Sequence, residues 1–164
     1  MHTTKSDRYE LLLKQVSALL AGETNLIANM ANTVAAIHEA MGFWWTGYYL
    51  VEGQELVLGP FQGPVACTRI PYGKGVCGTA WQRLETIVVP DVSLFPGHIA
   101  CSSESKSEIV VPVLKSDFRP LSAQNPVLAV LDIDSRDFNT FDDIDAHYLS
   151  ILARLPFAPL LFPV

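Results

Sequence analysis

The sequence contains three cysteines, and these are its strongest candidates for a chemical role. Cys101 lies in a polar stretch rich in serine, where a thiolate would be accessible to a substrate. Cys77 begins a predicted short helix, and the N-terminus of a helix lowers the pKa of a thiol. Cys67 precedes both of them. The pattern predicts either a redox pair, in which one cysteine attacks and another resolves, or three small residues of a hydrophobic core.

A zinc site is a third interpretation of the same residues. Cys67, Cys77, His98 and Cys101 would supply three sulfur ligands and one nitrogen ligand. Their spacing lacks the close pair of cysteines that most structural zinc sites use, so the sequence disfavours this interpretation.

Acidic residues alternate with apolar ones at the end of the predicted strand 127–134. The period of two places Asp132 and Asp134 on one face of that strand. Neighbouring carboxylates repel each other unless a cation lies between them or one of them is protonated. Glu108 lies at the start of another predicted strand, 109–114. These acids predict a site for a cation, although strand ends that emerge into solvent have the same pattern.

Aromatic residues form a third group. Trp45, Gly47 and Tyr49 share one face of the predicted strand 43–51, and the glycine leaves a gap between the two rings. Such pairs pack in a core or at a dimer interface, or they form the wall of a cavity. With the thiols and acids, they predict a pocket for a ligand that has both an apolar group and a positive charge.

The elements that would hold these residues indicate an α+β fold. We expect one domain over 1–164, with N-terminal helices at 5–41, a sheet core at 43–135, a C-terminal helix at 141–155 and a proline-rich tail. The order predicts a central antiparallel sheet of about six strands with helices packed on one face. The predicted strands are 43–51, 56–58, 65–70, 86–89, 109–114 and 127–134. Long loops at 90–107 and 115–126 complete the chain, and such loops are usually functional.

Composition narrows the classes of function. The chain is 49% hydrophobic and 17% charged, which favours a packed core over disorder. A net charge of −6 without a cluster of Lys or Arg excludes a nucleic-acid partner. The sequence has neither an apolar run of about 18 residues nor a signal peptide, so we expect no membrane partner and a cytoplasmic location.

Longer motifs resemble a known family. GHIAC at 97–101 followed by SEIVVP at 107–112 is similar to the signature of the free methionine-(R)-sulfoxide reductases, enzymes of the GAF fold. GPFQGPVAC at 59–67, IPYGKGVCGTA at 70–80, WTGYY at 45–49 and VLDIDS at 130–135 also resemble this family. The resemblance runs from about residue 43 to 145. Ser102 departs from it, since an acidic residue is expected after the last cysteine.

The resemblance implies a role for each candidate cysteine. Cys101 would attack the sulfur of free methionine sulfoxide, and Cys67 would resolve the sulfenic acid that forms. Cys77 is the alternative in either role. The implied enzyme binds no cofactor and no metal, is recycled by an external thioredoxin-like dithiol and forms a homodimer.

The resemblance also implies how the substrate is bound. Trp45 and Tyr49 would line the methyl and thioether groups, and the acids Glu108, Asp132 and Asp134 would bind the ammonium group and supply a proton. From the position of the loop, we expect backbone N–H groups near Ile99 and Ala100 to hold the substrate carboxylate. A GAF module that senses a small ligand without catalysis is the alternative function.

Overall fold

The computed structural model describes residues 3–115 and 126–161. Its helices and strands follow one another in this order: α1 (Lys5–Leu20), α2 (Leu26–Met41), β1 (Trp45–Glu52), β2 (Glu55–Gln62), β3 (Arg69–Pro71), α3 (Gly75–Arg83), β4 (Ile87–Val89), η1 (Val92–Leu94), β5 (Ser107–Leu114), β6 (Val127–Ser135), α4 (Asp143–Leu152), η3 (Leu155–Phe157) and α5 (Ala158–Leu161). Among the described residues, no helix combines the length and the apolar character needed to cross a membrane.

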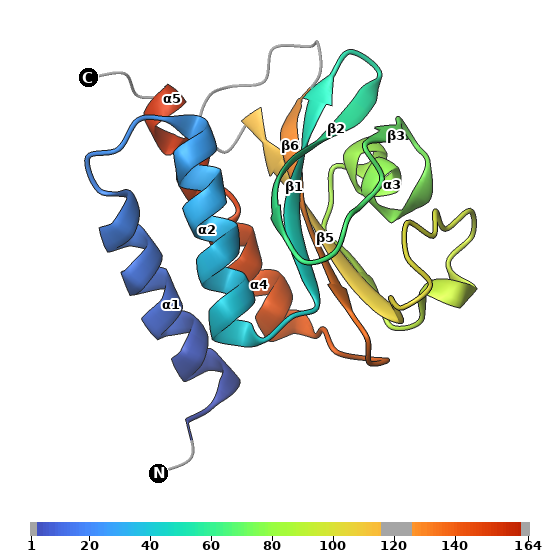
Figure 1. The fold of residues 1–164 in the computed structure, drawn as a ribbon, viewed down its shortest axis with the longest axis horizontal. Coiled ribbons are helices and arrows are strands. Elements are labelled where there is room, and N and C mark those ends of the chain that lie inside the picture. The colour runs from blue at the N-terminus through green and yellow to red at the C-terminus, as the bar shows by residue number, and fades with distance from the viewer. Residues whose placement is uncertain (1–2, 116–125, 162–164) are drawn as a thin grey trace.

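The strands form one sheet in the order β3-β2-β1-β6-β5-β4, and every neighbouring pair is antiparallel (Figure 1). β6 lies at the centre, between β1 and β5. Its alternation of side chains agrees with the prediction, because Leu131 and Ile133 point into one layer of the core while Asp132 and Asp134 line a cavity on the other face.

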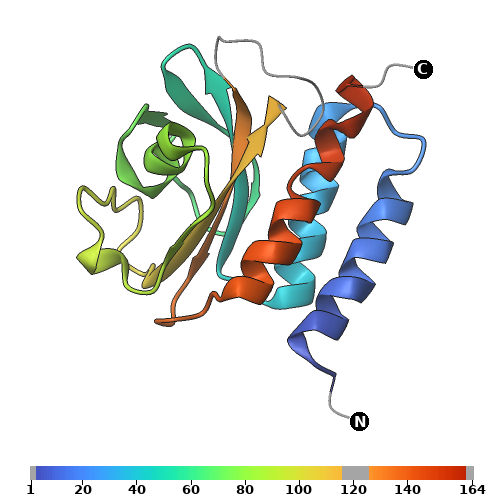
Figure 2. The same cartoon turned by 180° about the vertical axis from the view of Figure 1, so that it is seen from behind.

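Helices cover the two faces of the sheet unequally. The long helices α1, α2 and α4 lie on one face, and the short helix α3 lies on the opposite face (Figures 1 and 2). The thick helical layer buries one hydrophobic core, which includes Tyr9, Val34 and Leu149, each with no exposed surface. α3 covers a second core with Trp81 at its edge. The loops between β2 and α3 and between β4 and β5 lie on this same side, away from the long helices.

The structure confirms the predicted α+β fold and its six-stranded antiparallel sheet. It corrects two details: the short helix α3 packs on the face opposite to the long helices, and one predicted strand is shorter. The segment predicted as a strand at 65–70 is a strand only from Arg69 onward, and the Thr68 carbonyl before it accepts a hydrogen bond from the N–H of Leu58 on β2 at 2.9 Å. The prediction is wrong before that residue, where the Cys67 carbonyl accepts a hydrogen bond from the Tyr49 hydroxyl and the carbonyl of Pro64, just before the segment, accepts one from Trp45 Nε1. Most of the predicted loop at 115–126 and the end of the proline-rich tail lie outside the described residues.

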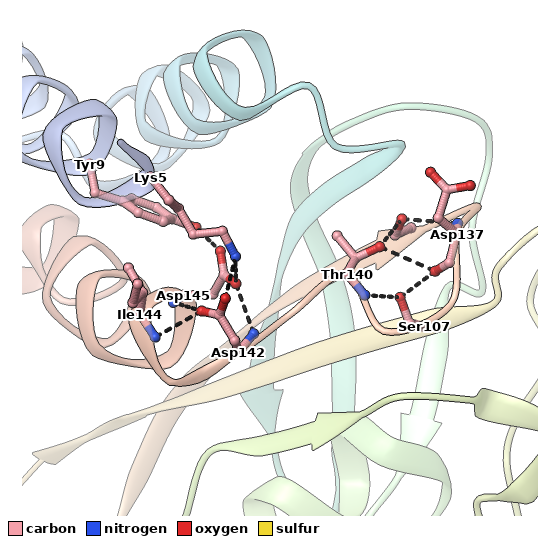
Figure 3. A network of polar contacts seen from close by, with 9 residues as sticks. Lys5, Tyr9, Ser107, Asp137, Thr140, Asp142, Ile144 and Asp145 are labelled. Atoms are coloured by element: carbon pink, nitrogen blue, oxygen red, sulfur yellow. Dashed lines mark hydrogen bonds and ion pairs between the residues drawn. The ribbon is translucent and has the colours of Figure 1, made fainter. Parts of the chain in front are cut away.

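One polar network ties the sheet to the loop before α4, and a second joins two helices of the helical layer (Figure 3). At the start of β5, the Ser107 hydroxyl donates to the carbonyl of Asp137 at 2.6 Å and accepts from the N–H of Thr140 at 3.4 Å. These bonds hold Ser107, the residue directly before Glu108, in place. In the second network, the buried carboxylate of Asp145 joins α4 to α1.

That second network generates a prediction for stability. The Tyr9 hydroxyl donates to Asp145 Oδ1 at 2.7 Å, and the Lys5 ammonium donates to Oδ2 of the same carboxylate at 2.5 Å. Tyr9→Phe should lower the free energy of unfolding by about 1.5–3 kcal/mol, the usual worth of a hydrogen bond to a charged group. Urea denaturation measures this loss.

Tyr148→Phe is the matched control. Its ring stacks on Tyr9 with centroids 5.2 Å apart, but its hydroxyl contacts Glu10 at 3.3 Å in an exposed position. This substitution should change the free energy of unfolding by no more than about 0.5 kcal/mol. Equal losses in the two variants would contradict the importance of the buried bond.

Candidate active site

Three acids from two adjacent strands face one cavity on the α3 side of the sheet. Glu108 on β5 pairs directly with Asp134 on β6, and Asp132 lies two residues earlier on the same face of β6. Glu108 is 5% exposed and Asp132 is 6% exposed. The strand register therefore brings Glu108 beside two carboxyl groups that lie more than twenty residues later in the sequence.

Burial raises the pKa of each of these three carboxyl groups well above its usual value, and repulsion between the acids raises it further. In the described part of the chain, no Lys or Arg forms an ion pair with them. His98 Nε2 lies 3.6 Å from Glu108 Oε2, but burial lowers the pKa of this histidine, which favours its neutral form. The cavity can therefore hold a proton on an acid and still attract a cation.

A disulfide closes one side of the cavity. Cys67 and Cys101 are bonded, with Cα atoms 5.4 Å apart. Both belong to loops that lie outside the strands, and Cys101 lines the cavity. The Ser105 hydroxyl donates to Asp134 Oδ1 at 2.6 Å, which ties the Cys101 loop to the acids. A bond that can be reduced thus lies beside the acidic groups.

The environment of the Cys77 thiol differs from the one that the sequence suggests. It lies in the first turn of α3, as predicted, but its thiol is buried and lines the floor of the cavity. Burial, together with the nearby acids, raises its pKa. The predicted lowering of this pKa by the helix N-terminus is therefore wrong. The sulfur and one oxygen each from Glu108 and Asp132 lie within 4.8 Å of one another.

Two aromatic residues of β1 also line the cavity. The rings of Trp45 and Tyr49 stack with centroids 6.0 Å apart, above the gap predicted at Gly47. A Cβ atom at Gly47 would clash with the Trp45 ring and would lie 2.6 Å from Phe61 Cβ. The side chains also hold the Cys67 loop, because Trp45 Nε1 donates to the carbonyl of Pro64 at 3.0 Å and the Tyr49 hydroxyl donates to that of Cys67 at 2.8 Å.

The cavity gathers almost all of the residues that the sequence indicated. Its lining includes Trp45, Tyr49, Cys77, Ile99, Cys101, Glu108, Asp132 and Asp134. Cys67 joins this group through its disulfide, whereas Ala100 is exposed and is not among the residues that line the cavity. The zinc set considered from the sequence does not form, because two of its sulfurs are bonded to each other.

Sequence reasoning did not single out Ser105. This serine bonds to Asp134, yet nothing in the sequence distinguishes it from the other serines of the same loop. Its contact depends on the long-range approach of that loop to β6.

Comparisons with known proteins agree with this geometry. The GAF domain family model matches residues 25–155. The chain is 55% identical to GAF domain-containing protein A of Dictyostelium discoideum (93% of this chain, 92% of the relative) and 46% identical to free methionine-R-sulfoxide reductase of Escherichia coli K12 (92% and 88%). A solved structure of free methionine-R-sulfoxide reductase from Neisseria meningitidis, in complex with its substrate, superposes with a TM-score of 0.85 at 48% identity, covering 95% of this chain and 90% of that one.

The hydrogen bond between Tyr49 and Cys67 leads to a prediction about the disulfide. Tyr49→Phe should lower the equilibrium constant for closing the Cys67–Cys101 bond by about fivefold, since the lost hydrogen bond is worth about 1 kcal/mol. The fraction of oxidised protein in glutathione buffers of graded ratio, determined by alkylation and mass spectrometry, measures this change.

Tyr72→Phe provides the control, because the Tyr72 hydroxyl makes no hydrogen bond with the described residues and its ring packs on Trp81. The oxidised fraction of this variant should match that of the unmodified protein at every glutathione ratio. If the oxidised fraction of Tyr49→Phe also matched that of the unmodified protein, the Tyr49 hydroxyl would have no part in holding the Cys67 loop.

Proposed function

We infer that this chain, which belongs to the free methionine-R-sulfoxide reductases of the GAF domain family, reduces free methionine R-sulfoxide to methionine. The observation that carries this conclusion is the Cys67–Cys101 disulfide beside a cavity lined by three buried acids. A domain that only senses a ligand has no need for such a bond.

Cys101 is the nucleophile in the reduced enzyme. Its thiolate attacks the sulfoxide sulfur, the S–O bond breaks, and the oxygen is transferred to Cys101, which becomes a sulfenic acid. Methionine leaves with its sulfur reduced. The position of Cys101 in the lining of the cavity supports this role, because the sulfur can reach a bound ligand there.

A protonated acid assists this attack. The sulfoxide oxygen must gain a proton as its bond to sulfur breaks, and a neutral carboxyl group beside it supplies that proton. Glu108, Asp132 and Asp134 form a group in which burial and mutual repulsion favour one retained proton. The raised pKa values therefore support general-acid catalysis by this group.

Cys67 resolves the sulfenic acid. Its thiol condenses with the oxidised Cys101, water is released, and the disulfide seen in this structure is the product. A thioredoxin-like protein then exchanges its dithiol with this disulfide and restores both thiols. The exposed position of Cys101 and the partial exposure of Cys67 support access by such a protein.

The acids also explain why the substrate would be a free amino acid. Free methionine sulfoxide carries an ammonium group, which can pair with the buried carboxylates, whereas a residue within a peptide has none and would leave these carboxylates unpaired. The rings of Trp45 and Tyr49 would contact the methyl and thioether groups. Backbone groups near Ile99 and Ala100 would contact the carboxylate.

We further propose a homodimer and a cytoplasmic location, where reduced thioredoxin-like proteins are abundant. The apolar stripe of α1 packs inside its own subunit, since Tyr9, Leu12 and Val16 are buried. Leu19 and Ile27 remain exposed and would be available to a second copy.

The two cysteines have separable roles in a single-turnover experiment without reductant. Cys101→Ser should form no methionine, because the attacking sulfur is lost. Cys67→Ser should form about one methionine per chain but should fail to turn over with thioredoxin, because its sulfenic acid cannot become a disulfide. Chromatographic quantification of methionine distinguishes these results. A stoichiometric burst from Cys101→Ser would transfer the role of nucleophile to Cys77.

Recognition of the ammonium group can be tested with N-acetylated methionine sulfoxide. The unmodified enzyme should prefer the free substrate by roughly 10⁴ in kcat/KM, the discrimination typical of sites whose polar groups must be paired. Asp134→Asn should lower kcat/KM for the free substrate by about 100-fold and should affect the acetylated one much less.

Glu104→Gln is the matched control for this substitution. Glu104 lies in the same loop as Ser105 but pairs with Arg136 at 57% exposure of its side chain. Its loss should leave both values of kcat/KM unchanged. An equal decrease in kcat/KM for both substrates in Asp134→Asn would show that Asp134 does not bind the ammonium group.

A further inference from the structure

The thiol of Cys77 has no part in the exchange between Cys67 and Cys101, yet it lies at the floor of the same cavity. Its sulfur and one oxygen each from Glu108 and Asp132 lie within 4.8 Å of one another, and all three residues are buried. Cys77 comes from α3, Glu108 from β5 and Asp132 from β6. Three rigid elements therefore converge on one point with one sulfur and two carboxylate oxygens.

A second observation indicates that this group has unused capacity to bind a ligand. Asp132 Oδ1 is fully buried, and within the described residues it has no hydrogen-bond partner. A buried carboxylate oxygen without a donor is unfavourable unless a proton or a cation compensates for it. No Lys or Arg of the described chain forms an ion pair with Glu108 or Asp132. All three residues line the cavity, so a small cation could reach them through its opening.

We propose that Cys77, Glu108 and Asp132 form a binding site for a thiophilic divalent cation of the zinc class. One sulfur and two oxygens are donors that zinc accepts, whereas magnesium and calcium prefer oxygen alone. Three protein ligands leave the fourth position of a tetrahedral ion open toward the cavity. When the ion binds, the proton of the Cys77 thiol passes to solvent, and the sulfur binds as a thiolate. The bond formed is metal–sulfur, and no group is oxidised or reduced.

The ion would act as an inhibitor. This consequence rests on the proposed function, because the substrate ammonium group is assigned to the same acids. An ion held by Glu108 and Asp132 uses the oxygens that the ammonium group needs, so the two ligands exclude each other. Zinc would then suppress the reductase without any change in Cys67 or Cys101.

The oxidised protein allows a selective test, since Cys77 is its only free thiol. Titration with Cd²⁺, which replaces zinc and gives an ultraviolet cadmium–thiolate band, should produce that band with a stoichiometry of one ion per chain. Zn²⁺ should displace Cd²⁺ and abolish the band. Free methionine, which carries the ammonium group but cannot be reduced further, should raise the apparent dissociation constant of Cd²⁺ in proportion to its concentration. Lack of the band overturns the metal site, and a band unaffected by methionine overturns the competition between the ion and the substrate.

Variants distinguish coordination from simple attraction by negative charge. By calorimetry, Cys77→Ser and Glu108→Gln should each weaken Zn²⁺ binding by at least tenfold. Asp134→Asn, which removes a neighbouring charge without removing a ligand, should weaken it less. Equal effects in all three variants, or no effect of Cys77→Ser, would overturn coordination by this set.

The outcome is independent of the test for the reductase itself. Sulfoxide reduction is measured without added metal, and Cd²⁺ binding is measured without substrate. A protein that reduces methionine sulfoxide but gives no cadmium–thiolate band refutes only the metal site. A protein that gives the band but forms no methionine refutes only the proposed function.

Discussion

The cavity depends on keeping three carboxyl groups together in a place that is nearly closed to water. Their mutual repulsion would separate them on a flexible scaffold, but β5 and β6 cannot slide past each other. The opposite face of these strands places Ile109, Leu131 and Ile133 in the helix-side core with no exposed surface. A shift of one residue would turn these side chains toward the cavity and the acids toward the core. Apolar packing on one face therefore holds the charges in place on the other.

The sequence predicted the two faces of the strands but not their register. Alternation along 127–134 correctly separated Asp132 and Asp134 from their apolar neighbours, because a strand has a period of two. That Glu108 pairs with Asp134 depends on contacts between distant segments, and no local pattern encodes them. The resemblance to a family supplied this link, and the strand register supplies its physical basis.

Two predictions failed for a similar reason. The helix N-terminus was expected to lower the pKa of Cys77, an effect worth at most about 1–2 kcal/mol. Burial and the neighbouring acids oppose it and are stronger, so the pKa rises. Likewise, the β-propensity of 65–70 was overridden where Tyr49 bonds to the backbone of that segment and Trp45 bonds to Pro64 just before it. In both cases a tertiary contact that the sequence cannot reveal outweighed a local preference.

The same side chains that line the cavity also position the loops that contain Cys67 and Cys101. Tyr49 bonds to the carbonyl of Cys67, and Asp134 accepts the hydroxyl of Ser105 in the Cys101 loop. A ligand that moves the Tyr49 ring or pairs with Asp134 would therefore disturb a hydrogen bond that holds one of these two loops. Because the Cα atoms are 5.4 Å apart, within the range that a disulfide requires, small loop movements decide whether the bond can close. Under the proposed function, we expect substrate binding and closure of the disulfide to be coupled through these two hydrogen bonds.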